Sequence, residues 1–343
     1  MHKLFFSDID PEQQGNAIAS ACRVGDFKPN PLNNGINDLL VEGPKMWTAV
    51  DSPEEADVAV YSERYRRDGR AEEFAEQADR AGLHCLMFDF SDDSRPAREG
   101  PGTVYRCSID RSRRVERERA LSPICPNIVP IQDNPPLRSK SPTPTISFCA
   151  TVVPTWRRLV KRYLQKDRNL YGAVVRSQAI RHAKRCRQVK TDFIVGNKYM
   201  GGAGYFRHDT DRVNNIRERY RNNLLSGDYV LCIRGTGNYS FRFYETLSAG
   251  RIPLLVDTVG LLPLDDKIDW KQHALIVDVK DLENIGERVA EHYDSLTEDS
   301  FVDLQRSNRE LYFRSLSPSQ FLKAAVERAA ALKAQPSAAP SAF

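Results

Sequence analysis

The sequence predicts an α/β protein in which two Rossmann-like domains face each other across a cleft. The chain has 343 residues, enough for two domains that each bury a core of their own. Both halves alternate short apolar runs, typical of strands, with stretches of helical spacing. A proline-rich segment without periodicity lies between the halves and indicates a linker.

In the first half, residues 56–62 and 84–90 are apolar runs that predict strands. The segment between them predicts a helix, because Phe74 and Ala78 fall on one helical face and Gly82 stands where a helix should end. Strand, helix and strand in this order form the unit from which a parallel sheet is built.

The second half follows the same pattern after the linker. Its expected strands and helices are the strand "TISFCA" at 145–150, a helix at 153–167, the strand "DFIVG" at 192–196, a strand, helix and strand at 228–257, an apolar strand at 275–279, a helix at 282–296 and a long helix from Pro318. The expected division of the chain is an N-terminal domain at 1–135, a linker at 136–145, a C-terminal domain at 146–333 and a flexible tail at 334–343.

The composition predicts a reduced protein of the cytoplasm. Its net charge of +4 comes from 50 basic and 46 acidic residues, a balance that does not by itself indicate nucleic-acid binding. The N-terminus lacks the apolar run of a signal peptide, and no stretch is apolar for the length of a membrane-spanning helix. The seven cysteines include no C-x-x-C pair, which favours free thiols over disulfides or a zinc site.

The segment 228–257 carries the most specific chemistry. "DYVLCI" predicts a strand, "RGTGNY" a glycine-containing turn, "SFRFYETLSA" a helix, and "IPLLV" the next parallel strand. Ser240 stands at the N-cap position, where a helix start that follows a glycine turn offers N–H groups and a positive dipole end to a phosphate. Arg234 and Arg242 flank this turn and can add forked hydrogen bonds to phosphate oxygens.

A dinucleotide-cofactor site is one alternative for this segment. Gly235 and Gly237 follow a strand, and Asp257 ends the next strand, as the dinucleotide fingerprint requires. The third glycine of that fingerprint is replaced by Ser240, which argues against a dinucleotide.

A second alternative is purely structural, with Ser240 as a helix cap and an ion pair between Arg242 and Glu245. The position of Glu245 favours a nucleotide instead. It lies about 7.5 Å along the helix axis from Ser240, at 1.5 Å per residue, which is comparable to the distance between the distal phosphate and the ribose of a nucleotide. A carboxylate there can accept both ribose hydroxyls, so the segment predicts a nucleoside diphosphate as ligand.

The block "LLSGDYVLCIRGTGNYSFRFYETLSAGRIPLLVDTVGLLPLDDKIDWKQHALIV" resembles the core of the exostosin family of glycosyltransferases. The family's pattern is a strand with a cysteine followed by Arg-Gly, then Ser-x-Arg-x-x-Glu-Ala, an Ile-Pro strand, and a Trp shortly before an apolar strand. The match spans roughly residues 215–285. The sequence departs from the pattern at Thr246, where Ala is usual, and at Arg251, where Cys is usual.

The resemblance implies a GT-B fold, with the sugar nucleotide bound by the C-terminal domain and the acceptor by the N-terminal one. It implies transfer of a sugar from a nucleotide sugar, expected to be a UDP-sugar, to a glycan or lipid-linked acceptor in surface polysaccharide synthesis. Because the chain shows no membrane anchor, a soluble bacterial-type member is expected. Carried over by position, the donor-binding residues are Arg234, Gly235, Ser240, Arg242, Phe243 and Glu245, with Glu245 on the ribose.

An inverting reaction is expected, because Gly237 occupies the place where many retaining GT-B enzymes carry a second Glu. The catalytic base should then lie on a strand-end loop of the first domain. The candidates by position are Asp8, Asp10, Asp92 and Asp93, with Asp8 and Asp92 ranked first. No D-x-D pair stands at a strand end of the donor half, so we expect no metal and no cofactor besides the nucleotide-sugar co-substrate.

A basic run at residues 157–190 contains twelve Lys or Arg residues and one Asp. It fits either the solvated face of two helices or a cationic rim that attracts an anionic substrate or the headgroups of a membrane. The rival function is a non-enzymatic nucleic-acid-binding protein that uses residues 157–221, in which Trp156, Tyr163, Tyr171 and Phe206 could stack on bases. That alternative leaves the Ser-x-Arg-x-x-Glu pattern unexplained, so nucleic acid is not among the expected partners.

Overall fold

The computed structural model describes five parts of the chain, which are residues 1–7, 47–122, 135–152, 172–196 and 210–333. The chain forms two compact units. The first unit comprises Met1–Pro126, Leu261–Leu264 and Arg314–Phe343, and the second comprises Asn127–Gly260 and Asp265–Phe313.

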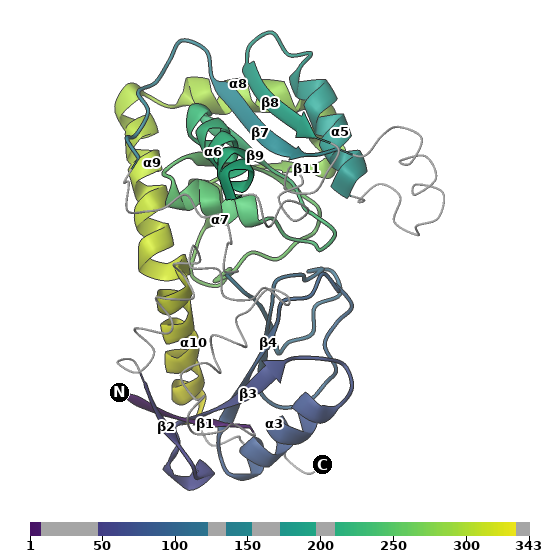
Figure 1. Cartoon of the computed structure of the whole chain (residues 1–343), viewed down its shortest axis with the longest axis vertical. Helices are drawn as coiled ribbons and strands as arrows, with labels where there is room; N and C mark the ends of the chain where they lie inside the picture. Colours follow the sequence, from purple (N-terminus) through teal and green to yellow (C-terminus); the bar gives the residue numbers. More distant parts are fainter. Residues whose placement is uncertain (8–46, 123–134, 153–171, 197–209, 334–343) are drawn as a thin grey trace, which may run out of the picture. The chain divides into compact units, whose positions relative to one another are not determined.

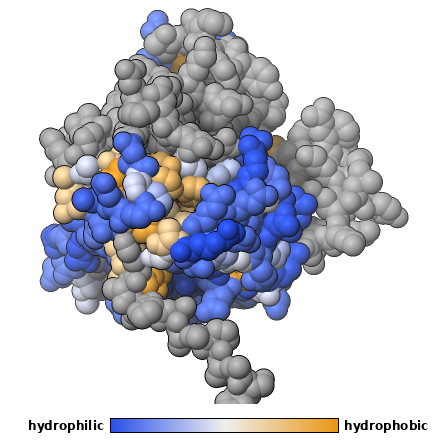
Figure 2. All heavy atoms as spheres, turned by 90° about the horizontal axis from the view of Figure 1, so that it is seen from below, coloured by the Kyte–Doolittle hydropathy of each residue, from blue (hydrophilic) through white to orange (hydrophobic). Residues whose placement is uncertain are grey.

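The first unit is built on a parallel sheet with the strand order β2-β1-β3-β4-β5-β6. Its elements are β1 (His2–Phe6), β2 (Trp47–Val50), β3 (Val58–Arg64), α3 (Arg70–Arg80), β4 (His84–Asp89), β5 (Thr103–Arg106), β6 (Glu118–Ala120) and α10 (Pro318–Lys333). Helices α3 and α10 flank the sheet (Figure 1). Seen from below, the described surface is mostly hydrophilic with scattered apolar patches (Figure 2), an ordinary composition for a protein surface.

The two helices cover opposite faces of this sheet. Successive side chains of a strand point to opposite faces, and α3 and α10 contact different sets of them. On one face, Cys85 and Met87 of β4 belong to the same buried cluster as the alanines of α3. On the other face, Phe88 stacks on Tyr105 at 5.7 Å between ring centroids, and Tyr105 meets the edge of Phe321 in α10 at 5.5 Å. Both faces of the first sheet are therefore buried.

The position of α10 corrects the predicted division of the chain. The sequence analysis assigned all of residues 146–333 to the second domain, whereas α10 packs on β1, β3 and β4 and belongs to the first unit. The reason is long-range: Phe321 and its apolar neighbours complete a hydrophobic face whose other half lies some two hundred residues earlier in the chain. The predicted tail, residues 334–343, lies outside the described residues.

The second unit is also built on a parallel sheet, with the order β11-β10-β9-β7-β8. Its elements are β7 (Thr145–Thr151), α5 (Gly172–Ala183), β8 (Lys190–Gly196), α6 (Thr210–Ser226), β9 (Tyr229–Cys232), α7 (Phe241–Ser248), β10 (Ile252–Asp257), β11 (Leu275–Asp278), α8 (Ile285–Ser295) and α9 (Glu298–Leu311). A single buried cluster joins the strands to α5 and α8. The two parallel sheets confirm the predicted fold class, an α/β protein of two Rossmann-like domains as in GT-B proteins, and the cleft between them stays a prediction.

The predicted linker is also corrected, because its described residues are fixed to the second unit. Asp228, which is fully buried, accepts from Arg138 Nε at 2.6 Å and from the backbone N–H of Thr145 at 2.8 Å. The backbone N–H of Arg138 donates to Gln305 Oε1 at 2.9 Å. Segment 136–145 is therefore part of the second unit, anchored by a buried carboxylate.

The order of the second sheet reverses between β7 and β9. From β7 the chain passes through α5 to β8 on one side, and then through α6 to β9 on the other side of β7. In open α/β sheets, ligands bind at the carboxyl ends of the strands at such a switch point. The topology therefore predicts a ligand site where β7 and β9 end.

None of the helices in the described part of the chain has both the length and the apolarity to cross a membrane.

Candidate functional site

The predicted turn and helix lie at this carboxyl edge of the second sheet. After β9, the N–H of Gly235 donates to the carbonyl of Tyr239 at 3.2 Å and closes the turn. Ser240 has extended backbone angles and immediately precedes α7, which ends before Gly250 at a φ of +61°. The strand, turn, helix and strand predicted for residues 228–257 are all present.

Ser240 does not act as the helix cap that the structural alternative requires. Its hydroxyl makes no capping hydrogen bond to the described residues of α7, and its side chain is half-buried. The backbone carbonyl of Ser240 accepts from the N–H of Phe243 at 3.1 Å, as a residue in this position normally does. The hydroxyl can therefore serve a ligand at the start of α7.

Arg242 links the first turn of α7 to the switch point. Its Nη2 donates to the carbonyl of Cys149 in β7, and its guanidinium lies over the rings of Phe148 at 4.7 Å and Tyr220 at 5.5 Å. Burial lowers the pKa of Arg242, but the attraction of Tyr220, Cys232, Glu245 and Cys149 outweighs it and leaves the pKa raised. Arg242 is thus a positive charge that is held in place between the first turn of α7 and the end of β7.

Glu245 is buried beside this charge, with 2% of its surface exposed. Its Oε2 accepts a hydrogen bond from the hydroxyl of Tyr220 in α6. Burial raises the pKa of Glu245, while the hydrogen bond from Tyr220 and the charge of Arg242 act in the opposite direction. Burial, followed by the charge of Glu245, also raises the pKa of Tyr220. Glu245 is therefore held in one orientation by a neutral phenol.

Tyr220 is a site residue that the sequence analysis missed. It lies in α6, 25 residues before Glu245, and outside the segment that shows the motif. Only the packing of α6 beside β7 and β8 brings it to α7. No local pattern in the sequence signals that contact.

Two of the predicted donor-binding residues have different surroundings from those expected. Phe243 has 1% of its surface exposed and packs on Trp270 at 5.2 Å between ring centroids, so its side chain belongs to the core and its ligand contact stays a prediction. The same contact gives the tryptophan of the motif a structural role. Arg234 is half-buried, and its Nη2 donates to the carbonyl of Thr236 within the turn at 3.0 Å.

The two departures from the motif have structural roles. The hydroxyl of Thr246 donates to the carbonyl of Arg242 one helical turn earlier, at 2.6 Å. Arg251 is buried and donates to the carbonyls of Leu225, Ala249 and Gly250, which lie at the ends of α6 and α7. A cation is favourable at helix C-termini, although burial lowers the pKa of Arg251 to about 10.

A strained loop follows β10 beside the same turn. Val259 has a φ of +63°, which is an outlier for a β-branched residue, and its N–H donates to Asp257 Oδ1 at 2.8 Å. Asn238 in the turn and Thr258 in the loop exchange two hydrogen bonds, of 3.0 Å and 2.7 Å. Strain of this kind persists where surrounding contacts enforce it, often at functional sites.

The predicted catalytic bases belong to the first unit, where Asp8 and Asp10 lie outside the described residues. Asp93 follows β4 and forms a two-pronged pair with Arg95, whose Nη2 lies 2.7 Å from Asp93 Oδ2. The hydrogen bonds from Arg95 lower the pKa of Asp93. Asp92 is exposed, and its backbone carbonyl accepts from Ser108 Oγ at 3.2 Å. The ranking of Asp92 above Asp93 stays a prediction, and it agrees with the pairing of Asp93.

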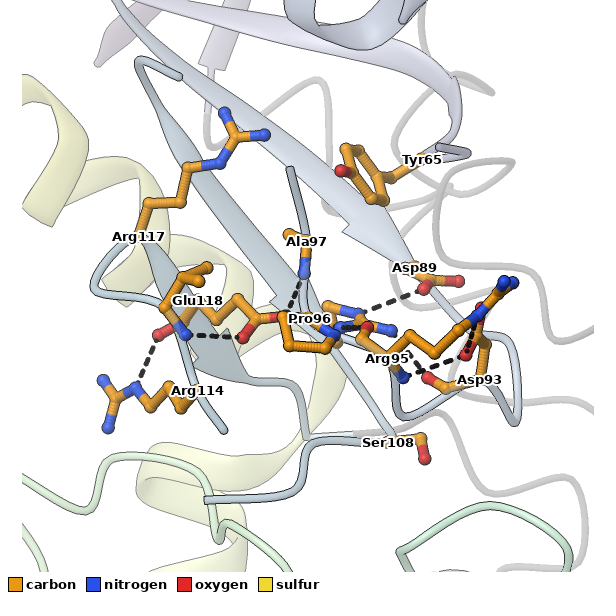
Figure 3. A network of polar contacts seen from close by, with 12 residues as sticks. Tyr65, Asp89, Asp93, Arg95, Pro96, Ala97, Ser108, Arg114, Arg117 and Glu118 are labelled. Carbon is orange, nitrogen blue, oxygen red and sulfur yellow. Dashed lines mark hydrogen bonds and ion pairs between the residues drawn. The ribbon is translucent and has the colours of Figure 1, made fainter. Parts of the chain in front are cut away.

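The loop that carries Asp92 is held by a buried arginine network (Figure 3). Arg106, with 2% of its surface exposed, pairs with Asp89 at 3.1 Å and with Glu118. Its remaining donors reach the backbone carbonyls of Asp93 at 2.6 Å and Arg95 at 2.7 Å. This network fixes the backbone just after β4, in the loop that carries Asp92.

The exposed cations in the described part of the basic run lie away from the turn. Five exposed cations gather at the end of α5 and the start of β8, namely Arg181, Lys184, Arg185, Arg187 and Lys190. Because β8 runs parallel to β7, the start of β8 is at the amino edge of the sheet, opposite the ligand edge. These five residues are therefore no rim of the candidate site. The aromatic residues proposed for base stacking, Trp156, Tyr163, Tyr171 and Phe206, lie outside the described residues.

No family model matches the chain. The chain is similar to exostosin-1 of Drosophila melanogaster, with 42% identity over 72 residues, which are 21% of this chain and 10% of that protein. An exostosin-1 homologue of Caenorhabditis elegans is 31% identical over 96 residues, 28% of this chain and 24% of that protein. These similarities confirm the predicted resemblance to exostosins, and the aligned segment spans less than a quarter of each relative.

Solved structures give weaker likenesses. A glycosyltransferase from Rickettsia africae ESF-5 aligns with a TM-score of 0.42 and 10% identity, over 96% of this chain and 98% of that chain. TarM aligns with a TM-score of 0.38 and 10% identity, over 73% and 55% of the two chains. Among the described residues of this chain, no cluster of three or more His, Cys, Asp or Glu side chains could hold a metal ion.

Replacement of Glu245 by Gln tests the burial of this carboxyl group. Because burial raises its pKa above the ordinary value of about 4.3, the folded state binds the proton more tightly than the unfolded state. The stability that results is fully present below the unfolded pKa and is lost as pH rises through the folded pKa. We expect the wild type to lose stability relative to Glu245→Gln as the pH rises above the unfolded pKa and through the raised folded pKa, as measured by urea denaturation. Exposed Glu287→Gln is the control, and parallel curves for wild type and Glu245→Gln would contradict the raised pKa.

Proposed function

We propose that this protein is a glycosyltransferase that moves a sugar from a nucleotide sugar, most simply a UDP-sugar, to a glycan or lipid-linked acceptor in surface polysaccharide synthesis. The observation that carries the proposal is the pairing of two features at one switch point. The first is the start of α7, where the Ser240 hydroxyl makes no capping hydrogen bond. The second is Glu245, which lies about one and a half helical turns later, is buried and is oriented by a hydrogen bond from Tyr220. The similarity to exostosins supports the same activity.

The start of α7 would hold the diphosphate of the donor. The N-terminal dipole and the Ser240 hydroxyl provide hydrogen-bond donors, and the fixed charge of Arg242 lies below them. Arg234 in the preceding turn adds a second cation. A site of this kind stabilises the negative charge that develops on a leaving diphosphate.

Glu245 would hold the ribose. Tyr220 already donates to its Oε2, so the ribose hydroxyls would donate to Oε1. An ionised carboxylate is the stronger acceptor, and the charge of Arg242 favours that form. The raised pKa set by burial would therefore fall when a nucleotide supplies two further donors.

For the reaction itself we propose a single displacement with inversion. A base of the first unit, Asp8 or Asp92, would deprotonate the acceptor hydroxyl, which attacks the anomeric carbon as the diphosphate leaves. Gly237 stands where a second acid would be needed for the retaining pattern. The expectation that no metal takes part rests on the sequence and stays a prediction.

We also propose that the enzyme acts in the cytoplasm and contacts an anionic membrane. The five exposed cations at residues 181–190 are suited to lipid headgroups, and their place at the amino edge keeps them apart from the donor site. An acceptor carried on a lipid would explain such a contact.

Replacement of Glu245 by Ala should weaken UDP binding, because both ribose hydroxyls lose their acceptor. We expect a loss of about one to three orders of magnitude, or roughly 1.5–4 kcal/mol for a charged hydrogen-bond partner, in isothermal titration calorimetry. Tyr220→Phe should give a smaller loss, since the carboxylate stays but loses its orienting bond. Exposed Glu287→Ala should bind UDP as the wild type does. Unchanged affinity in Glu245→Ala would remove this residue from the site.

The stereochemistry of the product tests the mechanism. Single displacement from an α-linked sugar nucleotide predicts a β-linked product, which proton NMR of the anomeric signal identifies. Turnover should continue in the presence of a chelator, since side-chain cations and the helix dipole would carry the charge of the leaving group. An α-linked product would rule out inversion and leave the donor site standing.

Membrane contact can be measured with sedimented vesicles. Vesicles of phosphatidylcholine with added phosphatidylglycerol should bind the protein at low salt and release it as ionic strength rises. The double variant Arg181→Glu with Lys184→Glu should bind them weakly, while UDP binding stays unchanged. Equal partitioning of the wild type onto neutral and anionic vesicles would show that these cations are ordinary solvent-exposed residues that do not bind the membrane.

A further inference from the structure

The carboxyl ends of β7 and β9 are joined by a side chain that the motif does not include. Arg176 lies in the second turn of α5 and is half-buried. Its Nη1 donates to the carbonyl of Thr151, the last residue of β7, at 3.1 Å. Its Nη2 donates to the carbonyl of Arg234, just beyond the end of β9, at 2.8 Å. One guanidinium group therefore spans the switch point.

The first residue of the same helix touches the same turn. A Cβ on Gly172 would lie 2.5 Å from the carbonyl oxygen of Gly235 and 2.6 Å from that of Arg234. Both obstacles are backbone atoms, so only glycine fits this close approach. Gly172 and Arg176 are four residues apart and hence share one helix face. The start of α5 is thus fixed to the turn by two independent contacts.

Gly235 differs from Gly172 in a way that points to a ligand. Its φ is not in the left-handed region, and in the described structure a Cβ there would meet one atom within 4 Å, Arg176 Nη2 at 3.8 Å. That distance is an ordinary van der Waals contact. Neither conformation nor packing among the described residues therefore requires glycine at this position. The open side of Gly235 faces the guanidinium of Arg176.

We propose that Arg176 is the positioning residue of the anion-binding turn, and that the diphosphate of the nucleotide passes over Gly235 beside its guanidinium. The inference rests on the proposed nucleotide-sugar site and deepens it. Arg176 fixes the carbonyls of Thr151 and Arg234 and so holds the turn at the ends of the two strands. Glycine at 235 then lets the phosphate oxygens approach the backbone without a side chain in between.

The choice of arginine follows from the geometry. The two carbonyls belong to different strands, and a planar fork reaches both at once, whereas a lysine ammonium is a point charge. Arg176→Lys should therefore keep the positive charge and lose the bridge between the carbonyls of Thr151 and Arg234. Arg176→Met should lose both the charge and the bridge.

The test is calorimetric titration of the full chain with UDP, UMP and inorganic pyrophosphate. We expect Arg176→Met to bind UDP about tenfold to a hundredfold more weakly, as for loss of charged hydrogen bonds, and Arg176→Lys to recover part of the loss. The loss should be larger for UDP and pyrophosphate than for UMP, because the second phosphate lies over Gly235. A purely structural role of Arg176 would lower all three affinities together and would overturn the proposal. Arg288→Lys, an exposed arginine of α8 in ion pairs, is the control.

The two glycines give a second and independent test. Gly235→Ala should unfold at the wild-type temperature without ligand and bind UDP at least tenfold more weakly. Gly172→Ala should unfold at a lower temperature, because its Cβ meets two backbone oxygens. Wild-type UDP affinity in Gly235→Ala would overturn the proposal.

The same titrations separate this inference from the proposed function. If the wild type binds pyrophosphate and not UDP, the nucleotide-sugar function fails, and Arg176 and Gly235 are judged by the pyrophosphate affinities of their variants. If the wild type binds neither UDP nor pyrophosphate, both the function and the inference are overturned.

Discussion

The parallel pairing of β7 with β9 is the constraint on which the candidate site depends. These two strands are far apart in the sequence, and they become neighbours because the chain crosses back over β7 after β8. Their adjacency lets Arg242 of α7 reach the carbonyl of Cys149 in β7. It also brings Tyr220, on the crossover helix α6, to Glu245. If α7 followed a strand elsewhere in the sheet, none of these contacts could form.

Arginines set the geometry of both units by binding backbone carbonyls. Arg106 holds the carbonyls of Asp93 and Arg95 in the first unit, and Arg251 holds those at the ends of α6 and α7 in the second. A buried cation is costly unless its donors are satisfied, and a guanidinium has enough donors to satisfy several carbonyls at once. The protein thereby places positive charge close to strand ends and helix ends while fixing the loops around it. At the candidate site, Arg242 and Arg176 bind the backbone carbonyls of Cys149, Thr151 and Arg234 in the same way.

The local features of the site could be predicted from sequence, and its long-range contacts could not. The helix expected at 240–249 is observed as α7, Phe241–Ser248, and the strand expected at 252–256 as β10, Ile252–Asp257. Both depend on patterns that repeat within a few residues. Tyr220 was missed, and α10 was predicted as a helix but assigned to the other domain. Each acts on partners that lie at least 25 residues away, where no period or spacing connects them. The burial of the Phe243 side chain was not foreseen, because the motif shows which residues recur and not which face of α7 each one occupies.

The packing of α10 on the first sheet has a consequence for how the protein is made. The sheet needs α10 to cover Phe88 and Tyr105, but α10 begins at Pro318, long after β6 has left the ribosome. At synthesis rates of about 5–20 residues per second, the face with Phe88 and Tyr105 stays uncovered for roughly 10–40 seconds until α10 has been synthesised. During this time it is open to chaperones and to contacts with other nascent chains. Truncation of the chain before α10, by a premature stop codon or by proteolysis, should therefore destabilise the first unit, although most of that unit is synthesised first.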